Sequence, residues 1–185
     1  MVISQNGGLS GMMMSLSPNR RIAYVAGTVF VLDQLTKWIV LRYLAYAHEK
    51  VIISGFFKFV HWGNTGAAWS LLVGNNGLLA LVALVALVAL YFTRHHFGAD
   101  QIPGQLALGL IFGGICGNLF DRIVRRHVVD FLYFYVNSHD GRVEHGFPAF
   151  NVADSAICVG VGLIFLLNWK AQKPSEKAAE TPAPR

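Results

Sequence analysis

Two aspartates, Asp130 and Asp154, have the side-chain type and the placement that acid–base catalysis requires. Asp130 closely follows an apolar segment at about 102–124, and Asp154 opens the next apolar segment, at about 152–169. If these segments form an antiparallel helical hairpin, both carboxylates lie at one end of it and at similar depth. Two neighbouring carboxylates do not ionise together easily and tend to share one proton. One can then act as general base and the other as general acid, a pair that activates water and protonates a departing amine.

Small and polar residues recur at helical spacing on one face of each of these two segments. They are Gly114, Asn118, Arg122 and Arg125 on the first, and Asn151, Asp154, Ser155, Cys158 and Gly162 on the second. Faces of this kind pack together in a membrane, and their polar outer ends would line a shared cavity. The alternative is that these groups only join the helices and terminate the spans.

Asp33 and Lys37 form a second charged pair inside an apolar segment. They are four residues apart and therefore share one helical face. Charged residues within a span are costly and are usually paired or functional. We favour a self-satisfied ion pair, and the functional alternative is that one of the two residues shapes the cavity.

The sequence contains no pattern that predicts a metal or a cofactor. Its seven histidines include no His-Glu-x-x-His motif, and the two cysteines, Cys116 and Cys158, lack zinc-ligand spacing. His127, three residues before Asp130, is interpreted as a solvated interfacial side chain. We therefore expect catalysis by carboxylates alone, with no cofactor and no bound metal.

The composition predicts a membrane protein. Hydrophobic residues make up 54% of the 185-residue chain and charged residues only 14%, with a mean hydropathy of +0.47. Soluble domains carry about a quarter charged residues, and a soluble fold would have to bury nearly every apolar side chain of this small chain. The net charge is +5, but the basic residues are scattered. This distribution favours contact with anionic lipid headgroups over nucleic acid.

Four apolar segments, at about 22–41, 77–93, 102–124 and 152–169, approach the roughly 20 residues that cross a bilayer. We expect a single membrane domain at 20–169, a disordered leader at 1–19 and a disordered cytoplasmic tail at 170–185. The long connections must lie on one side of the membrane, opposite both termini and the short turn at 94–101. Lys and Arg are divided equally, seven to each side, so the positive-inside rule orients the chain only weakly, through Arg20 and Arg21 beside the first span.

The two long connections carry strand signals. In the first, an aromatic run at 56–62 leads into a turn at 63–66, which predicts a small sheet at the membrane interface. In the second, runs at 131–136 and 143–150 flank a polar turn. That pattern fits a hairpin, and a short interfacial helix is the open alternative.

Five segments of the chain, taken in order, resemble the motif blocks of the bacterial lipoprotein signal peptidases, also called signal peptidase II. They read VLDQLTK at 31–37, NTGAAWS at 64–70, GGICGNLFDR at 113–122, HVVDF at 127–131 and FNVADS at 150–155. The resemblance runs from the first span to the fourth. Five blocks in one order are far more specific than any single block.

This resemblance implies a mainly α membrane protein, a four-transmembrane-helix bundle with a small periplasmic β-cradle between the first and second helices. It implies the inner membrane, cytoplasmic termini, and an active site near the periplasmic face. The implied activity is aspartic-type cleavage of diacylglyceryl-modified prolipoproteins before the lipidated cysteine, by a monomer in contact with membrane lipids. The implied catalytic pair is Asp130 and Asp154. The implied supporting residues are Asp33, Lys37, Asn64, Gly66, Gly114, Asn118, Arg122 and Asn151.

Two other functions compete with this interpretation. A proton-coupled carrier would also place carboxylates and arginines in a bundle, but nearer the membrane midplane and on a path open to both sides. A non-catalytic lipid-binding or scaffold protein would account for the aromatic connection. It would not account for the pairing of Asp130 with Asp154.

Overall fold

Four long helices and a small sheet make up the computed structural model, which describes residues 16–66, 74–138 and 144–172. The helices are α2 (Pro18–Tyr43), α3 (Asn76–Thr93), α4 (Ile102–Val124) and α5 (Val152–Gln172). A short 3₁₀ turn, η2 (Arg94–Phe97), extends α3, and Gly98 closes it in the left-handed conformation. All four helices are long and apolar enough to cross a membrane, so the four predicted spans are confirmed.

The helix ends differ slightly from the predicted boundaries. Helix α2 already begins at Pro18, within the predicted leader, because proline suits the first turn of a helix. Helix α5 continues to Gln172, three residues into the predicted tail. The remaining parts of the predicted leader and tail, 1–15 and 173–185, lie outside the described residues.

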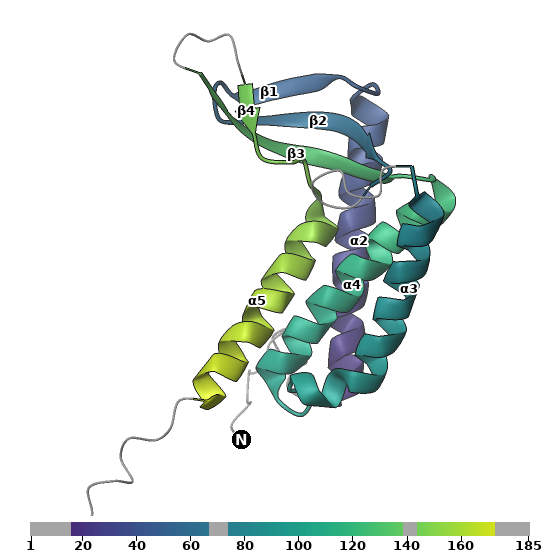
Figure 1. Ribbon diagram of the computed structural model, residues 1–185, viewed down its shortest axis with the longest axis vertical. Helices are drawn as coiled ribbons and strands as arrows, with labels where there is room; N and C mark the ends of the chain where they lie inside the picture. Colours follow the sequence, from purple (N-terminus) through teal and green to yellow (C-terminus); the bar gives the residue numbers. More distant parts are fainter. Residues whose placement is uncertain (1–15, 67–73, 139–143, 173–185) are drawn as a thin grey trace, which may run out of the picture.

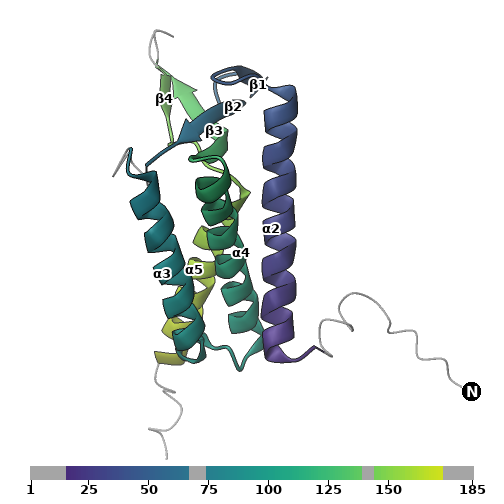
Figure 2. The same ribbon diagram turned by 90° about the vertical axis from the view of Figure 1, so that its right-hand side faces the viewer.

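Helix α4 is the centre of the bundle. It packs against α2 and α5 and also contacts α3 (Figures 1 and 2). Glycines on α4 allow this close packing. A Cβ on Gly113 would lie 2.6 Å from the carbonyl oxygen of Ala26 in α2, and one on Gly109 would lie 2.6 Å from the Cβ of Val25. These glycines let α2 and α4 approach closely, as small residues do where membrane helices pack together.

One antiparallel sheet covers one end of the bundle (Figure 1). Its strands follow the order β1 (Glu49–Ile53), β2 (Phe57–Asn64), β3 (Val128–Asn137) and β4 (Glu144–Gly146). The sheet was predicted from the connection between the first two spans alone, whereas β3 and β4 come from the second long connection. The pairing of β3 with β4 decides the open alternative in favour of the hairpin, and the pairing of β2 with β3 joins both long connections in one sheet.

Lys58 connects the strands of the sheet. Its side chain, on β2, is buried and forms ion pairs with Glu49 on β1 at 2.8 Å and with Glu144 on β4 at 2.9 Å. Its ammonium also lies over the rings of Tyr133 and Tyr135 on β3. One lysine thus contacts all three other strands, which fixes the sheet that carries Asp130.

Candidate active site

The two predicted catalytic aspartates come from different kinds of element. Asp130 is the third residue of strand β3 and is only 3% exposed, whereas Asp154 lies half-buried in the first turn of α5. Helix α4 ends at Val124, and Arg126 then takes a left-handed conformation that turns the chain into β3. Asp130, which was predicted only to follow the third apolar segment closely, therefore lies in the sheet.

Asn151 bridges the two carboxylates. Its Nδ2 donates to Asp130 Oδ1 at 2.9 Å, and its backbone N–H donates to Asp154 Oδ2 at 3.2 Å. In return, Asn151 Oδ1 accepts from the backbone N–H of Asp154 at 2.9 Å. This reciprocal pair is a capping box, in which the residue before a helix and its third residue satisfy each other. The start of α5 therefore fixes Asp154, and the same asparagine reaches across to Asp130.

A short polar chain supports Asp130 from the other side. Asn64 Nδ2 donates to Asp130 Oδ2 at 2.9 Å, and Asn64 Oδ1 accepts from the backbone N–H of Gly66 at 2.8 Å. Arg122 Nη2 donates to the Gly66 carbonyl oxygen at 2.8 Å. Arg122 thus acts on Asp130 through Gly66 and Asn64, by holding the end of β2 in place.

Asn118 supports Asp154. Its Nδ2 donates to Asp154 Oδ1 at 2.7 Å, while its Oδ1 accepts from Asn151 Nδ2 at 3.2 Å. Each carboxylate therefore receives hydrogen bonds from two asparagines, Asn151 being common to both. Hydrogen bonds to the ionised form favour it, so these donors partly offset the cost of removing two carboxylates from water.

Burial and mutual repulsion keep a proton on the pair. Burial is the main cause that raises the pKa of Asp130 from 3.8 to about 7, and the negative charge of Asp154 is the second. The amides of Asn64 and Asn151 act in the opposite direction, as does the positive charge of Lys37. Near neutral pH the site can therefore supply both a carboxylate and a carboxylic acid, which is what general acid–base catalysis needs.

The predicted ion pair between Asp33 and Lys37 is present at 2.8 Å, and both side chains are fully buried. It is not self-satisfied, however, because Lys37 also pairs with Asp121 of α4 at 2.8 Å. Asp121 in turn pairs with Arg125, which also donates to Gln34. Sequence reasoning assigned no site role to Asp121 or Gln34, although both lie within the quoted motif segments.

Gly114 is not one of the groups that contact the carboxylates. A Cβ at Gly114 would collide with the backbone of Ala153 and with Ile157, so this glycine lets α4 and α5 approach closely. Asn64 and Gly66 of the second motif segment lie at the site, whereas 67–70 are outside the described residues. His127 is half-buried, and its ring lies where a side chain at Gly63 would go.

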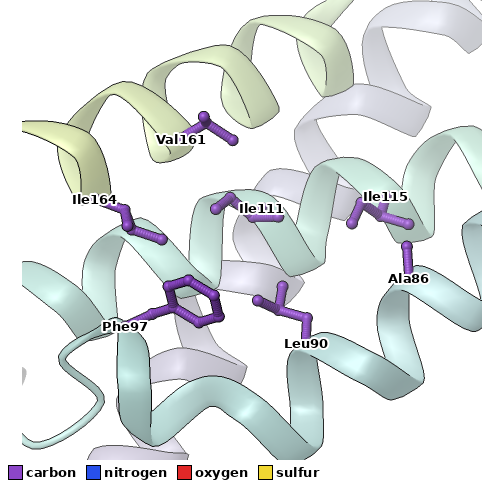
Figure 3. Close-up of a pocket in the computed structure, with 7 residues that line it drawn as sticks. All are labelled: Ala86, Leu90, Phe97, Ile111, Ile115, Val161 and Ile164. Atoms are coloured by element: carbon purple, nitrogen blue, oxygen red, sulfur yellow. The ribbon is translucent and has the colours of Figure 1, made fainter.

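A separate apolar pocket lies between α3, α4 and α5 (Figure 3). Its volume is about 290 Å³. It is lined by seven apolar residues: Ala86, Leu90, Phe97, Ile111, Ile115, Val161 and Ile164. Helix α5 places Val161 and Ile164 about 10 and 15 Å along its axis from Asp154, at 1.5 Å per residue. The pocket has no group that could take part in acid–base chemistry.

Comparisons with known proteins identify the family of this chain. A family model described as Signal peptidase (SPase) II matches residues 25–170. A lipoprotein signal peptidase of Symbiobacterium thermophilum is 44% identical over 139 residues, which cover 74% of this chain and 86% of the relative. The lipoprotein signal peptidase of Bacillus subtilis is 36% identical over 143 residues, covering 77% and 88%.

A solved structure of a bacterial membrane enzyme is similar over nearly its whole length. It covers 88% of this chain and 94% of its own, with a TM-score of 0.70 at 28% identity. A second bacterial membrane enzyme structure gives a TM-score of 0.63 at 29% identity. The match to the family model, over residues 25–170, includes both aspartates and most or all of each of the four helices. The chain therefore belongs to the signal peptidase II family, a family of aspartic peptidases.

Proposed function

We propose that this protein removes the signal peptide from diacylglyceryl-modified prolipoproteins by cleaving before the lipidated cysteine. The observation that carries the proposal is the pair Asp130 and Asp154, bridged by Asn151 where the sheet meets the bundle. Family membership supports the substrate class, because the similar proteins are named lipoprotein signal peptidases.

In the proposed reaction the pair shares one proton. The ionised aspartate takes a proton from water, whose oxygen attacks the scissile carbonyl carbon, and the protonated aspartate stabilises the developing oxyanion. A proton then passes to the leaving amine as the peptide bond breaks. Asn64, Asn118 and Asn151 hold the two carboxylates for this step, which needs no cofactor or metal. Gly66 and Arg122 position Asn64, and Lys37 with Asp33 supports the site from α2.

For the topology, we propose a multi-pass protein of the bacterial inner membrane with cytoplasmic termini and the site near the periplasmic face. Contacts of the basic residues support this orientation. Lys58, Arg122 and Arg125 on the sheet side are engaged by protein groups, so they are poorly placed to act as free charges at a leaflet. Arg21, which the sequence suggested as a topology signal, is also buried and bound to Gln105. Arg20, in the first turn of α2, is exposed.

We further propose that residues 20–169 act as one membrane domain and as a monomer that contacts membrane lipids. The donors that the described residues supply to the dyad, from Asn64, Asn118 and Asn151, belong to one chain, which supports a monomer. The apolar pocket of Figure 3 supports the contact with lipids, since it lies within the spans and has a wholly apolar lining.

A cleavage assay on purified protein tests this function. Protein in lipid nanodiscs is incubated with a diacylated prolipoprotein, and the shortened product is identified by mass spectrometry. The matched control substrate carries the same sequence with an unmodified cysteine, and we expect it to remain uncut. Activity should persist in chelators and in serine- or cysteine-directed inhibitors. Absence of product from the diacylated substrate would refute the proposed function, and loss in a chelator that a metal restores would refute the carboxylate-only mechanism.

A further inference from the structure

Lys37 is surrounded by three oxygen acceptors within the bundle. Its Nζ lies 2.8 Å from Asp33, 2.8 Å from Asp121 and 3.0 Å from Asn118 Oδ1. The side chain is fully buried, and an ammonium group has three donors and no acceptor. All three donors of Lys37 therefore have partners, and one of these partners belongs to the catalytic site.

The contact with Asn118 determines which way its amide faces. A primary amide can turn over and exchange its oxygen and nitrogen. Here the ammonium of Lys37 requires an oxygen, so the NH₂ group of Asn118 must point the other way, toward Asp154, where it donates at 2.7 Å. The reversed amide would place NH₂ against an ammonium and oxygen against a carboxylate. Lys37 thus selects the orientation that stabilises ionised Asp154.

The two carboxylates that hold Lys37 also hold the backbone beside each catalytic aspartate. Asp33 Oδ1 accepts from the N–H of Ala153 at 3.0 Å, and Asp121 Oδ2 accepts from the N–H of Val129 at 3.2 Å. Ala153 directly precedes Asp154, and Val129 directly precedes Asp130. One aspartate on α2 and one on α4 therefore fix the two chain segments that carry the dyad.

The charges of the cluster balance. Lys37 and Arg125 contribute two positive charges, and Asp33 and Asp121 contribute two negative ones. Lys37, Asp33 and Asp121 are all fully buried. Burying these charged groups costs desolvation free energy, and removing one of them would leave its partner as an uncompensated buried charge. We therefore expect the cluster to have a role that requires its geometry. Its hydrogen bonds lead to both halves of the dyad.

Resting on the proposed function, we infer that Asp121 and Lys37 are positioning residues: with Asp33 they form a buried clamp that sets the Asn118 amide and the backbone beside both catalytic aspartates. None of the three is asked to touch the substrate. The clamp should therefore govern turnover and the pH dependence of turnover, with little effect on substrate binding.

The variant Lys37→Met tests the clamp, because methionine is of similar length and has no donor. We expect kcat per folded molecule to fall at least tenfold, with KM changed less than threefold. The pH–rate profile should move by about one to two units to higher pH, the range expected when hydrogen bonds to a carboxylate and a nearby positive charge are lost. Lys37→Arg, which keeps the charge and has donors only, should keep the wild-type profile.

Asp121→Asn provides the second test, and it decides the matter if Lys37→Met fails to fold. It disrupts the clamp, so kcat should fall. It also removes a negative charge, so the pH–rate profile should move to lower pH, opposite to the change in Lys37→Met. The matched control is Gln105→Leu, a buried polar loss at the far end of the bundle, where Gln105 binds Arg21. This control should lower the melting temperature and leave the profile in place.

The wild-type protein separates the two proposals. If it does not cleave the diacylated substrate, the proposed function fails. If it cleaves, and folded Lys37→Met or Asp121→Asn retains the wild-type kcat and pH profile, the positioning role is refuted while the peptidase stands.

Discussion

Replacing Asp130 with asparagine should remove most of the turnover and at the same time stabilise the fold at alkaline pH. Burial and the charge of Asp154 raise the pKa of Asp130 to about 7 from 3.8, so ionisation of this group opposes folding. The cost is absent below pH 3.8, grows as the pH rises, and is complete above pH 7. It amounts to about 4 kcal/mol at 1.36 kcal/mol per pH unit. Asparagine cannot ionise and removes this cost.

The substitution also weakens the hydrogen bonds at position 130, which offsets part of this gain in the free energy of unfolding. Asp130 accepts from the NH₂ groups of both Asn64 and Asn151, whereas an asparagine at 130 has only one oxygen to offer. Its own NH₂ group must face one of these donors, at a cost of about 1–3 kcal/mol. We therefore expect Asp130→Asn to be more stable than the wild type by about 1–3 kcal/mol at pH 8, and to be no more stable than the wild type at pH 4.

The assay is thermal unfolding in detergent across this pH range, with cleavage of the diacylated substrate measured on the same samples. Turnover should fall by at least about 100-fold, the lower range assigned to general acid–base catalysis. Asp100→Asn, an exposed aspartate in the short turn, is the matched control and should change neither property. If the aspartates only join helices, Asp130→Asn should instead melt earlier at pH 8, and its activity loss should follow the loss of folded protein. A folded Asp130→Asn enzyme with near wild-type turnover would refute the dyad.

Three further results are expected. Reporter fusions at Gly98 should report cytoplasm and those at Gly55 periplasm, and a periplasmic signal at Gly98 would reverse the proposed topology. Asn64→Ala should raise the pKa of Asp130 above about 7, since it removes a donor to the carboxylate; an infrared titration of the carboxyl band would detect this, and an unchanged midpoint would contradict it. Arg122→Ala should lower turnover at least tenfold in protein that still folds, with poor rescue by lysine, whereas full activity would remove Arg122 from the site.

The helices could be predicted from the sequence because a bilayer imposes a length and a composition that are visible residue by residue. The capping box at the start of α5 is local as well, since Asn151 and Asp154 are three residues apart. Asp154 was selected as a charged residue at the start of the fourth apolar segment, and Asp130 was placed at the same end of the bundle because it closely follows the third. Local signals also explain why the charged pair on α2 could be predicted from its spacing.

The long-range contacts could not be predicted in the same way. Strand β3 pairs with β2 so that Asp130 lies opposite Trp62, two residues before Asn64, with a register shift between Phe59 and Trp62. Helices α3 and α4 separate the two strands in the sequence, so no local spacing reveals this register. The second carboxylate at Lys37 is that of Asp121 on α4, which also pairs with Arg125. No local spacing links Lys37 to Asp121, so this contact could not be predicted. The count of seven Lys and Arg on each side of the membrane treated every basic residue as free. The sequence did not reveal that Lys58 and Arg21 are buried.

The position of the dyad at the junction of sheet and bundle suits a reaction between a lipid-borne substrate and water. Phe150 pairs with Leu132 of β3 through backbone hydrogen bonds in both directions, so the residue before Asn151 is tied to the strand two residues beyond Asp130. This bridge fixes the start of α5 against the sheet. Asp130 is thereby held in a nearly closed site, where its carboxyl keeps a proton near neutrality, while Asp154 retains some exposure. A deeper site would exclude the water that must attack, and a fully solvated one would ionise both carboxylates and lose the acid.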